Sequence, residues 1–260
     1  MDQQVSQMEA PAPVGSVASA LRILNLLAEA PRSLRLKDVA GPLGLNPSTC
    51  LNILRTLVAA GVAHHDPQTK TYGPGLGLAS LARAALARDQ RLAAARPLIE
   101  QIARRHGLTV MLWRRGGPDE MLLLAMASGD DAWRVQVGAG SRVHLLQGSM
   151  GRIMAAWGGF SDAELADRFE GLKWDRPLAF PEFLEQAAEA KARGWAVDEG
   201  YFHRSMTSLS APIIEPDGAC TSVLSAAMFS GQHDAAAKAV IARELIQTAQ
   251  TLAAEPFGPA

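Results

Sequence analysis

The chain is poor in cysteine and contains no long hydrophobic run. Only Cys50 and Cys220 occur among its 260 residues, too few for a disulfide framework. It has neither a cationic leader followed by an apolar core nor an uninterrupted apolar stretch long enough to cross a bilayer. We therefore expect a cytoplasmic protein that does not associate with membranes.

The residue patterns of common catalytic and metal sites are also missing. The six histidines form neither an HExxH motif nor a cluster spaced with cysteine, so the sequence predicts no zinc site. The segment Gly148-Ser149-Met150-Gly151 lacks the spacing of a nucleophile elbow, and no glycine-rich phosphate loop occurs. These absences favour a protein that is not an enzyme and that needs no cofactor.

Charge is divided unevenly along a chain whose formal net charge is only −1. Residues 20–88 carry eight Lys or Arg against three Asp or Glu, whereas residues 91–260 carry seventeen against twenty. The first segment is therefore net basic and the second net acidic. This distribution is compatible with nucleic-acid binding at one end and a different function for the remainder.

The basic segment contains the pattern of a helix-turn-helix. Residues 36–43 predict a short helix ended by Gly44. Asn46 followed by Pro47 predicts the N-cap and first residue of a second helix, which Gly61 ends. Apolar residues at three- and four-residue spacing form the inward face of this second helix. They are Cys50, Leu51, Leu54, Leu57 and Val58.

The opposite face of the second helix is polar, and its N-terminal end is suited to contacting base edges in the major groove. Residues 62–65 and 69–72 predict two short strands joined by a turn at 66–68, the pattern of a wing. We therefore expect a winged helix-turn-helix that binds double-stranded DNA. The predicted contacts are Ser48, Thr49, Asn52, Arg55 and Thr56 on the helix, and His65 and Lys70 on the wing.

The helix-turn-helix pattern does not by itself establish DNA binding. Helix pairs with short linkers also occur in all-helical domains with other functions. A second function class therefore stays open, a small-molecule sensor whose winged domain makes protein contacts.

Composition suggests where the domains begin and end. Residues 1–15 are polar and proline-containing and predict a disordered arm. Residues 16–75 are expected to form the winged domain, with Ser16 as the N-cap of its first helix. An alanine- and arginine-rich helix at 76–90 links this domain to residues 91–260, and its composition suits either a solvated face or a dimer contact.

The C-terminal segment predicts an α+β domain with one main sheet. Its first strands alternate with glycine-containing turns, which is typical of an antiparallel meander. The expected strands are 108–113, 120–127, 132–137, 195–198, 206–214 and 219–229. The expected helices contain 97–103 or lie near 149–158, 162–170, 181–193 and 234–254.

With these elements placed, the chain resembles the IclR-type transcriptional regulators over nearly its whole length after the arm. In the N-terminal half the resemblance rests on SALRILNLLAEAPRSLRLKDVAGPLGLNPSTCLNILRTLVAAGVAHHDPQTKTYGPG. In the C-terminal half it rests on VGAGSRVHLLQGSMGRIMAA, RGWAVDEGYFHRSMTSLSAPIIEPDG and SVLSAAM. The order and spacing of these blocks are more specific than any one of them.

The resemblance implies a winged helix-turn-helix domain, a linker helix and a GAF-like α/β domain that binds a small effector and assembles dimers and dimers of dimers. A helix N-terminus favours a carboxylate, and serine hydroxyls add donors, so we expect an organic-acid effector. The family pocket positions correspond to Gly148, Ser149, Met150, Asp198, Ser208 and Ser225.

Several positions depart from the family pattern. Where the family commonly has a histidine followed six residues later by a lysine, this chain has Leu146 and Arg152. Ser208 stands where a cysteine is usual, and Ala227 where a further pocket serine is usual. The pocket is therefore expected to be more apolar and to accept an aromatic or partly apolar acid. The apolar residues expected nearby are Met111, Trp113 and Met150.

Overall fold

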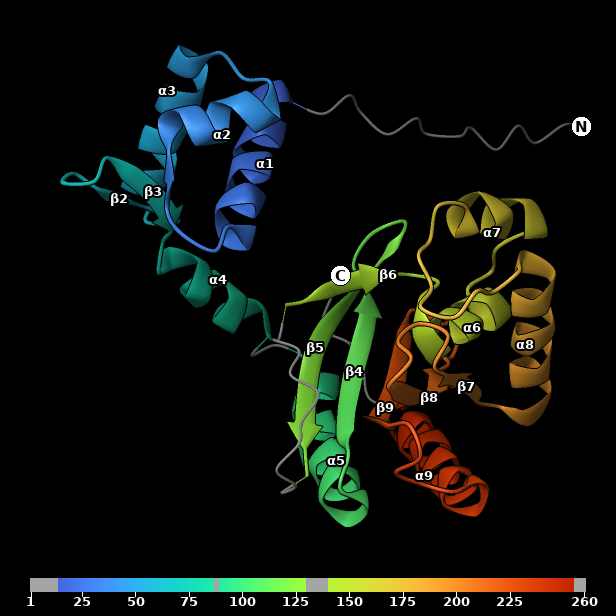
Figure 1. The fold of residues 1–260 in the computed structure, drawn as a ribbon. Helices are drawn as coiled ribbons and strands as arrows, with labels where there is room; N and C mark the ends of the chain where they lie inside the picture. The colour runs from blue at the N-terminus through green and yellow to red at the C-terminus, as the bar shows by residue number, and fades with distance from the viewer. Residues whose placement is uncertain (1–13, 87–88, 130–139, 255–260) are drawn as a thin grey trace, which may run out of the picture. The chain divides into compact units, whose positions relative to one another are not determined.

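The polypeptide divides into two units between residues 87 and 88 in the computed structural model (Figure 1). The structure describes residues 14–86, 89–129 and 140–254. No helix in these segments is long and apolar enough to cross a membrane.

The N-terminal unit is a winged helix-turn-helix, as the sequence predicts. Three helices pack around a common apolar core beside a small antiparallel sheet with strand order β1-β3-β2 (Figure 1). A further helix follows the sheet. The elements are α1 (Gly15–Glu29), β1 (Leu34–Arg35), α2 (Leu36–Leu43), α3 (Pro47–Ala59), β2 (Ala63–Asp66), β3 (Thr71–Pro74) and α4 (Gly77–Leu86).

Local chemistry ends α2 and starts α3 at the predicted positions. Gly44 follows α2 in the left-handed conformation with a φ of 63°, which glycine adopts without a steric penalty. Asn46 caps α3 by accepting the Ser48 N–H at 3.0 Å, and Pro47 occupies the first turn. Of the residues predicted on the inward face of α3, Cys50, Leu54 and Leu57 are buried, whereas Leu51 and Val58 are half-buried.

One local prediction for this unit is wrong. Helix α1 begins at Gly15 and therefore includes Ser16, and the preceding Val14 makes no side-chain cap bond. Helix α3 ends as predicted at Gly61, which is left-handed with a φ of 73° and donates its N–H to the Val58 carbonyl at 2.9 Å. Strand β1 was not predicted, because two residues are too few to produce an alternating pattern. Apart from its last two residues, the predicted arm lies outside the described part of the chain.

The turn of the wing is longer than predicted. The Asp66 carboxylate accepts the Gln68 N–H at 2.8 Å and the Thr69 hydroxyl at 2.7 Å, and these bonds hold the pKa of Asp66 below its usual value. Lys70 then adopts a left-handed φ of 55°. Strand β3 therefore starts at Thr71 instead of two residues earlier.

The predicted linker helix is interrupted. Helix α4 ends at Leu86, and a new helix, α5 (Gln90–His106), begins after Asp89. Asp89 has an extended backbone, and its side chain accepts the Leu92 N–H at 3.0 Å. Because an N-cap residue has a non-helical backbone, one continuous helix through 76–90 is excluded.

The C-terminal unit is an α+β domain built on one antiparallel sheet, in agreement with the sequence prediction. The strand order is β6-β5-β4-β9-β8-β7, so strands from the beginning and the end of this unit are neighbours. The predicted strand at 132–137 lies outside the described residues, and β6 was not predicted. The strands are β4 (Thr109–Arg115), β5 (Glu120–Ser128), β6 (Arg142–His144), β7 (Ala196–Glu199), β8 (Met206–Ile213) and β9 (Ser222–Phe229).

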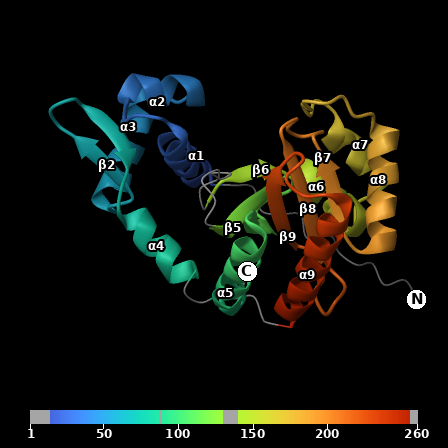
Figure 2. The ribbon, with the colours of Figure 1, turned by 60° about the horizontal axis from the view of Figure 1, so that its bottom comes forward.

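Helices cover both faces of this sheet (Figures 1 and 2). Strand alternation separates two apolar cores, because Val110 and Leu112 of β4 face one side while Met111 and Trp113 face the other. Helices α5 and α9 pack on the first side, and α6, α7 and α8 contribute to the second. Their bounds are α6 (Gly148–Trp157), α7 (Asp162–Phe169), α8 (Phe180–Arg193) and α9 (Ala235–Ala253), close to the predicted helices.

A buried ion pair holds the first turn of α5 to the turn between β8 and β9. Arg91 is 1% exposed, and two of its nitrogens donate to the Glu215 carboxylate at 2.6 and 2.8 Å. Such bidentate pairs combine charge with fixed geometry. The contact joins segments that lie 124 residues apart in the sequence.

Arg91→Met should lower the free energy of unfolding of the C-terminal unit by about 1–3 kcal/mol, because Glu215 stays partly buried without its partner. All five tryptophans lie beyond residue 88, so tryptophan fluorescence during denaturant unfolding monitors this unit.

Arg104→Met is the matched control for this variant. Arg104 and Glu100 form a pair whose side chains are 57% and 53% exposed. Loss of such a pair should change stability by less than about 0.5 kcal/mol. Equal destabilisation by the two variants would contradict the role assigned to Arg91.

Candidate functional site

The outer face of α3 presents a row of exposed polar side chains. Two of the predicted contact residues also stabilise the helix, since the Ser48 hydroxyl donates to Asn46 Oδ1 at 2.8 Å and the Thr56 hydroxyl to the Asn52 carbonyl at 3.0 Å. Among the described residues, the side chains of Thr49, Asn52 and Arg55 have no hydrogen-bond partner. These three side chains are therefore the most available for external contacts, and Asn52 and Arg55 are the longer ones. The exposed set is Ser48, Thr49, Asn52, Arg55 and Thr56.

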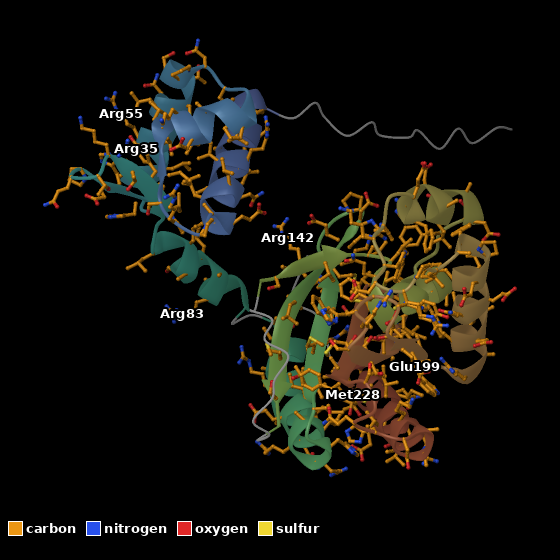
Figure 3. The ribbon with its side chains drawn as sticks, in the orientation of Figure 1. Arg35, Arg55, Arg83, Arg142, Glu199 and Met228 are labelled. Carbon is orange, nitrogen blue, oxygen red and sulfur yellow. The ribbon has the colours of Figure 1, made fainter. Side chains whose placement is uncertain are left out.

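The wing carries the two remaining predicted contacts in different environments. Lys70 is exposed in the turn. His65 is half-buried, and its ring lies 4.6 Å from the Tyr72 ring, so it has a packing role inside the unit. Arg35, which the sequence did not single out, is exposed and projects from the N-terminal unit, as does Arg55 (Figure 3).

A cavity of about 220 Å³ lies on the α6 side of the C-terminal sheet. Strands β4, β8 and β9 supply residues along one side, and the first turn of α6 and the segment after β7 supply others. The structure brings all eight predicted effector-binding residues to this cavity, although their binding of an effector stays a prediction. They are Met111, Trp113, Gly148, Ser149, Met150, Asp198, Ser208 and Ser225.

Six other described residues line the cavity, and of these only Ala227 was named from the sequence, as a pocket position that departs from the family pattern. Met206 lies two positions before Ser208 on β8, so strand alternation could have identified it. Phe202 and His203 lie in the loop after β7, where no periodicity indicates the direction of a side chain. The residues not singled out as contacts are Val143, Gln147, Phe202, His203, Met206 and Ala227.

Four serine hydroxyls form a continuous chain of hydrogen bonds beside the cavity. Ser149 Oγ lies 2.8 Å from Ser208 Oγ and 2.7 Å from Ser210 Oγ. Ser210 Oγ in turn lies 2.7 Å from Ser225 Oγ, the residue directly opposite on β9. Three of the four residues are at most 4% exposed, and buried hydroxyls require partners. The four hydroxyls are one another's partners, and no other polar side chain among the described residues takes part.

Arg152 of α6 is fully buried and connects the cavity wall to neighbouring elements. Its Nη1 donates to the Gly148 carbonyl at 2.7 Å and to Asp198 at 2.6 Å, while Nε and Nη2 donate to Gln186 at 3.0 and 2.8 Å. Burial lowers the pKa of Arg152 from its ordinary value, and the charge of Asp198 opposes that shift. The aromatic rings beside the guanidinium belong to Trp174, Phe183 and Tyr201.

Asp198 lines the cavity, but both oxygens of its carboxylate already have partners. Oδ2 accepts from Arg152, and Oδ1 accepts the N–H groups of Tyr201 and Phe202 at 3.1 and 3.2 Å. These bonds hold the loop that carries Phe202 and His203 to the cavity. Asp198 therefore positions the cavity wall, since three of the roughly four acceptor sites of its carboxylate are used within the protein.

Apart from the serines, much of the lining is apolar. Met111, Trp113 and Met150 are 5–6% exposed. Within the described segments, no group of three or more His, Cys, Asp or Glu side chains could hold a metal ion. The arrangement suits a small, partly apolar ligand with few polar groups.

Both units match known domain families. Residues 16–67 match the IclR helix-turn-helix domain, and residues 83–254 match the domain described as bacterial transcriptional regulator IclR C-terminal. Together with the winged fold, these matches define a DNA-binding transcriptional regulator. The chain belongs to the IclR family.

Individual relatives agree with this assignment. The chain is 30% identical over 205 residues to the HTH-type transcriptional regulator BhcR of Paracoccus denitrificans, covering 76% of this chain and 72% of that protein. Its fold is similar to an IclR transcriptional regulator from Alicyclobacillus acidocaldarius, with a TM-score of 0.83, 26% identity and coverage of 94% and 99%. An IclR homologue from Microbacterium hydrocarbonoxydans, solved with 4-hydroxybenzoate, has the same fold, with a TM-score of 0.75, 21% identity and coverage of 92% and 99%.

Arg152→Met should destabilise the C-terminal unit by about 3–5 kcal/mol, because it leaves the buried Asp198 carboxylate without its cation. The double variant Arg152→Met/Asp198→Asn should recover part of this loss, since it removes both charges. These two variants and the single variant Asp198→Asn can be compared by denaturant unfolding monitored by tryptophan fluorescence.

Arg176→Met is the control, since Arg176 is exposed and contacts the Tyr201 ring from the solvent side at 4.2 Å. Its loss should cost no more than about 1 kcal/mol. Strictly additive losses in the Arg152/Asp198 cycle would show that the two side chains are not coupled.

Proposed function

We propose that this regulator binds operator DNA through the exposed face of α3 and that a small, partly apolar organic acid in the C-terminal cavity controls its operator affinity. The main support for this proposal is the cavity, in which apolar side chains surround a helix N-terminus and a row of serine hydroxyls. In this proposal residues 16–75 form the DNA-binding domain, 76–90 the connection, and 91–260 the effector-binding and oligomerisation domain.

The polar side of the cavity supports an acidic effector. The first N–H groups of a helix lack intrahelical partners and attract anions, and α6 begins at Gly148 on the cavity wall. The apolar lining supports an aromatic or otherwise partly apolar remainder. A volume of about 220 Å³ is smaller than typical drug-sized pockets of roughly 300–1,000 Å³, so a ligand with a single ring is favoured. The relative solved with 4-hydroxybenzoate is compatible with this size.

The DNA-binding unit supports recognition of paired half-sites by a homodimer. A single recognition helix contacts only a few base pairs, and dimers of helix-turn-helix proteins place two such helices on half-sites spaced by whole turns of DNA. We therefore include self-association, as a dimer or a dimer of dimers, in the proposed function.

Asn52→Ala or Arg55→Ala should each weaken operator binding by roughly 1–3 kcal/mol, because each would remove a good base contact. Both side chains are exposed, so the fold should be retained. Mobility shift against DNA flanking the gene measures the loss, and Arg104→Ala on the C-terminal unit is a control with the same change of charge as Arg55→Ala.

If both α3 variants bound operator DNA as tightly as the wild-type protein, the outer face of α3 would not be the surface that reads the bases. If no flanking DNA shifted even at low salt, the winged domain would instead fit the protein-contact alternative, since phosphate contacts should give strongly salt-dependent binding.

Effector and operator should also change one another's affinity by the same factor. Regulatory coupling between two sites is typically about 1–3 kcal/mol and is thermodynamically reciprocal. A thermal-shift screen of organic acids would first identify a ligand that stabilises the protein. Calorimetric titration of that acid with and without saturating operator then measures the coupling. Identical dissociation constants would establish a binding domain without allosteric control.

A further inference from the structure

The four serine hydroxyls beside the cavity form a chain of hydrogen bonds. They hold four protons but make only three hydrogen bonds with one another. Each serine hydroxyl can donate once and can accept more than once. One proton is therefore left without an acceptor inside the chain, and both end residues, Ser208 and Ser225, line the cavity.

The contacts of Ser208 fix the direction of the hydrogen bonds along this chain. Ser208 Oγ accepts the Ser149 N–H at 3.3 Å and the Ser149 hydroxyl at 2.8 Å. Because Ser149 uses its only hydroxyl proton there, it must accept from Ser210 in their 2.7 Å contact. Ser210 has then used its own proton, so Ser225 must donate to Ser210.

The two ends consequently differ in what they offer to a ligand. Ser208 retains a hydroxyl proton that has no acceptor among the described residues. Ser225 has given its proton to Ser210 and retains lone pairs that no described donor uses. One end of the hydroxyl chain therefore offers a hydrogen-bond donor to the cavity, and the other end offers an acceptor.

The ends are also separated along the sheet. Ser208 pairs with Ala227 in the β8–β9 register, whereas Ser225 pairs with Ser210. Ser208 and Ser225 are thus diagonal neighbours, whose side chains typically lie up to about 7–8 Å apart. A ligand that fills the cavity of about 220 Å³ can therefore contact both hydroxyls with different polar groups.

We infer that the effector is a ring-sized acid that also carries a hydrogen-bond donor at its far end, with its carboxylate at Ser208 and its hydroxyl or amino group at Ser225. This inference rests on the proposed function, since it assumes that the cavity binds an acid. It adds the requirement for a donor and identifies Ser225 as the residue that selects for it.

Three benzoates test this inference by calorimetric titration of the full-length protein. Benzoate lacks a second polar group, 4-fluorobenzoate has a small substituent without a proton to donate, and 4-hydroxybenzoate carries the donor. Wild-type protein should bind 4-hydroxybenzoate roughly 2- to 10-fold more tightly than 4-fluorobenzoate, the factor expected for one net hydrogen bond.

Two variants should separate the contribution of Ser225 to ligand binding from that of Ser208. Ser225→Ala removes the acceptor for the far end of the ligand. The other hydrogen bonds, from Ser210 to Ser149 and from Ser149 to Ser208, are left in place. The preference for 4-hydroxybenzoate should therefore disappear, while the affinity for benzoate is retained. Ser208→Ala should weaken all three acids by a similar factor and keep the preference. Ser222→Ala is the control, because Ser222 is buried on the same strand, has no hydrogen-bond partner for its hydroxyl in the described structure and does not line the cavity.

The possible failures are distinguishable. Equal wild-type affinities for 4-hydroxybenzoate and 4-fluorobenzoate, or a preference that survives in Ser225→Ala, would overturn the inference while leaving an acid-binding cavity. Absence of binding by all three acids would overturn the inference together with the proposed ring-sized acidic effector.

Discussion

The buried guanidinium of Arg152 is the interaction on which the architecture of the cavity depends. A charge without solvent access requires a counter-charge and hydrogen-bond acceptors, and Arg152 finds them in Asp198, Gln186 and the Gly148 carbonyl. The same contacts hold the first turn of α6 and, through Asp198, the loop that follows β7. Satisfying one buried charge therefore positions two separate parts of the cavity wall.

The sheet serves two purposes because successive side chains point to opposite faces. On one face Leu112, Leu209 and Leu224 pack against α5 and α9 in a continuous apolar core. On the other face the same strands carry serines and methionines toward α6. Polar residues are tolerated there because their hydroxyls bond to one another. A rigid core thus lies directly behind an adaptable surface, which gives a binding site fixed support.

The two units differ in how their assigned roles were reached. In the N-terminal unit, exposure and free hydrogen-bonding groups at Asn52 and Arg55 agree with the helical spacing that predicted them. In the C-terminal unit, the predicted pocket residues meet at one cavity, and two of them also make contacts within the protein. The Asp198 carboxylate bonds to Arg152, and the Ser149 hydroxyl bonds to Ser208. A list of lining residues is therefore not equivalent to a list of ligand contacts.

The sequence by itself determined the winged helix-turn-helix, most element boundaries and the polar face of α3, because helix periods, the Asn46 cap and Gly44 are local signals. The pocket positions followed from the order of family motifs and not from any local period. Only the tertiary structure decided the partners of Arg152 and the hydroxyl chain. The Arg152–Asp198 and Ser149–Ser210 contacts join residues 46 and 61 positions apart. No short-range pattern specifies such pairings, since they depend on strand order and on how α6 packs across the sheet.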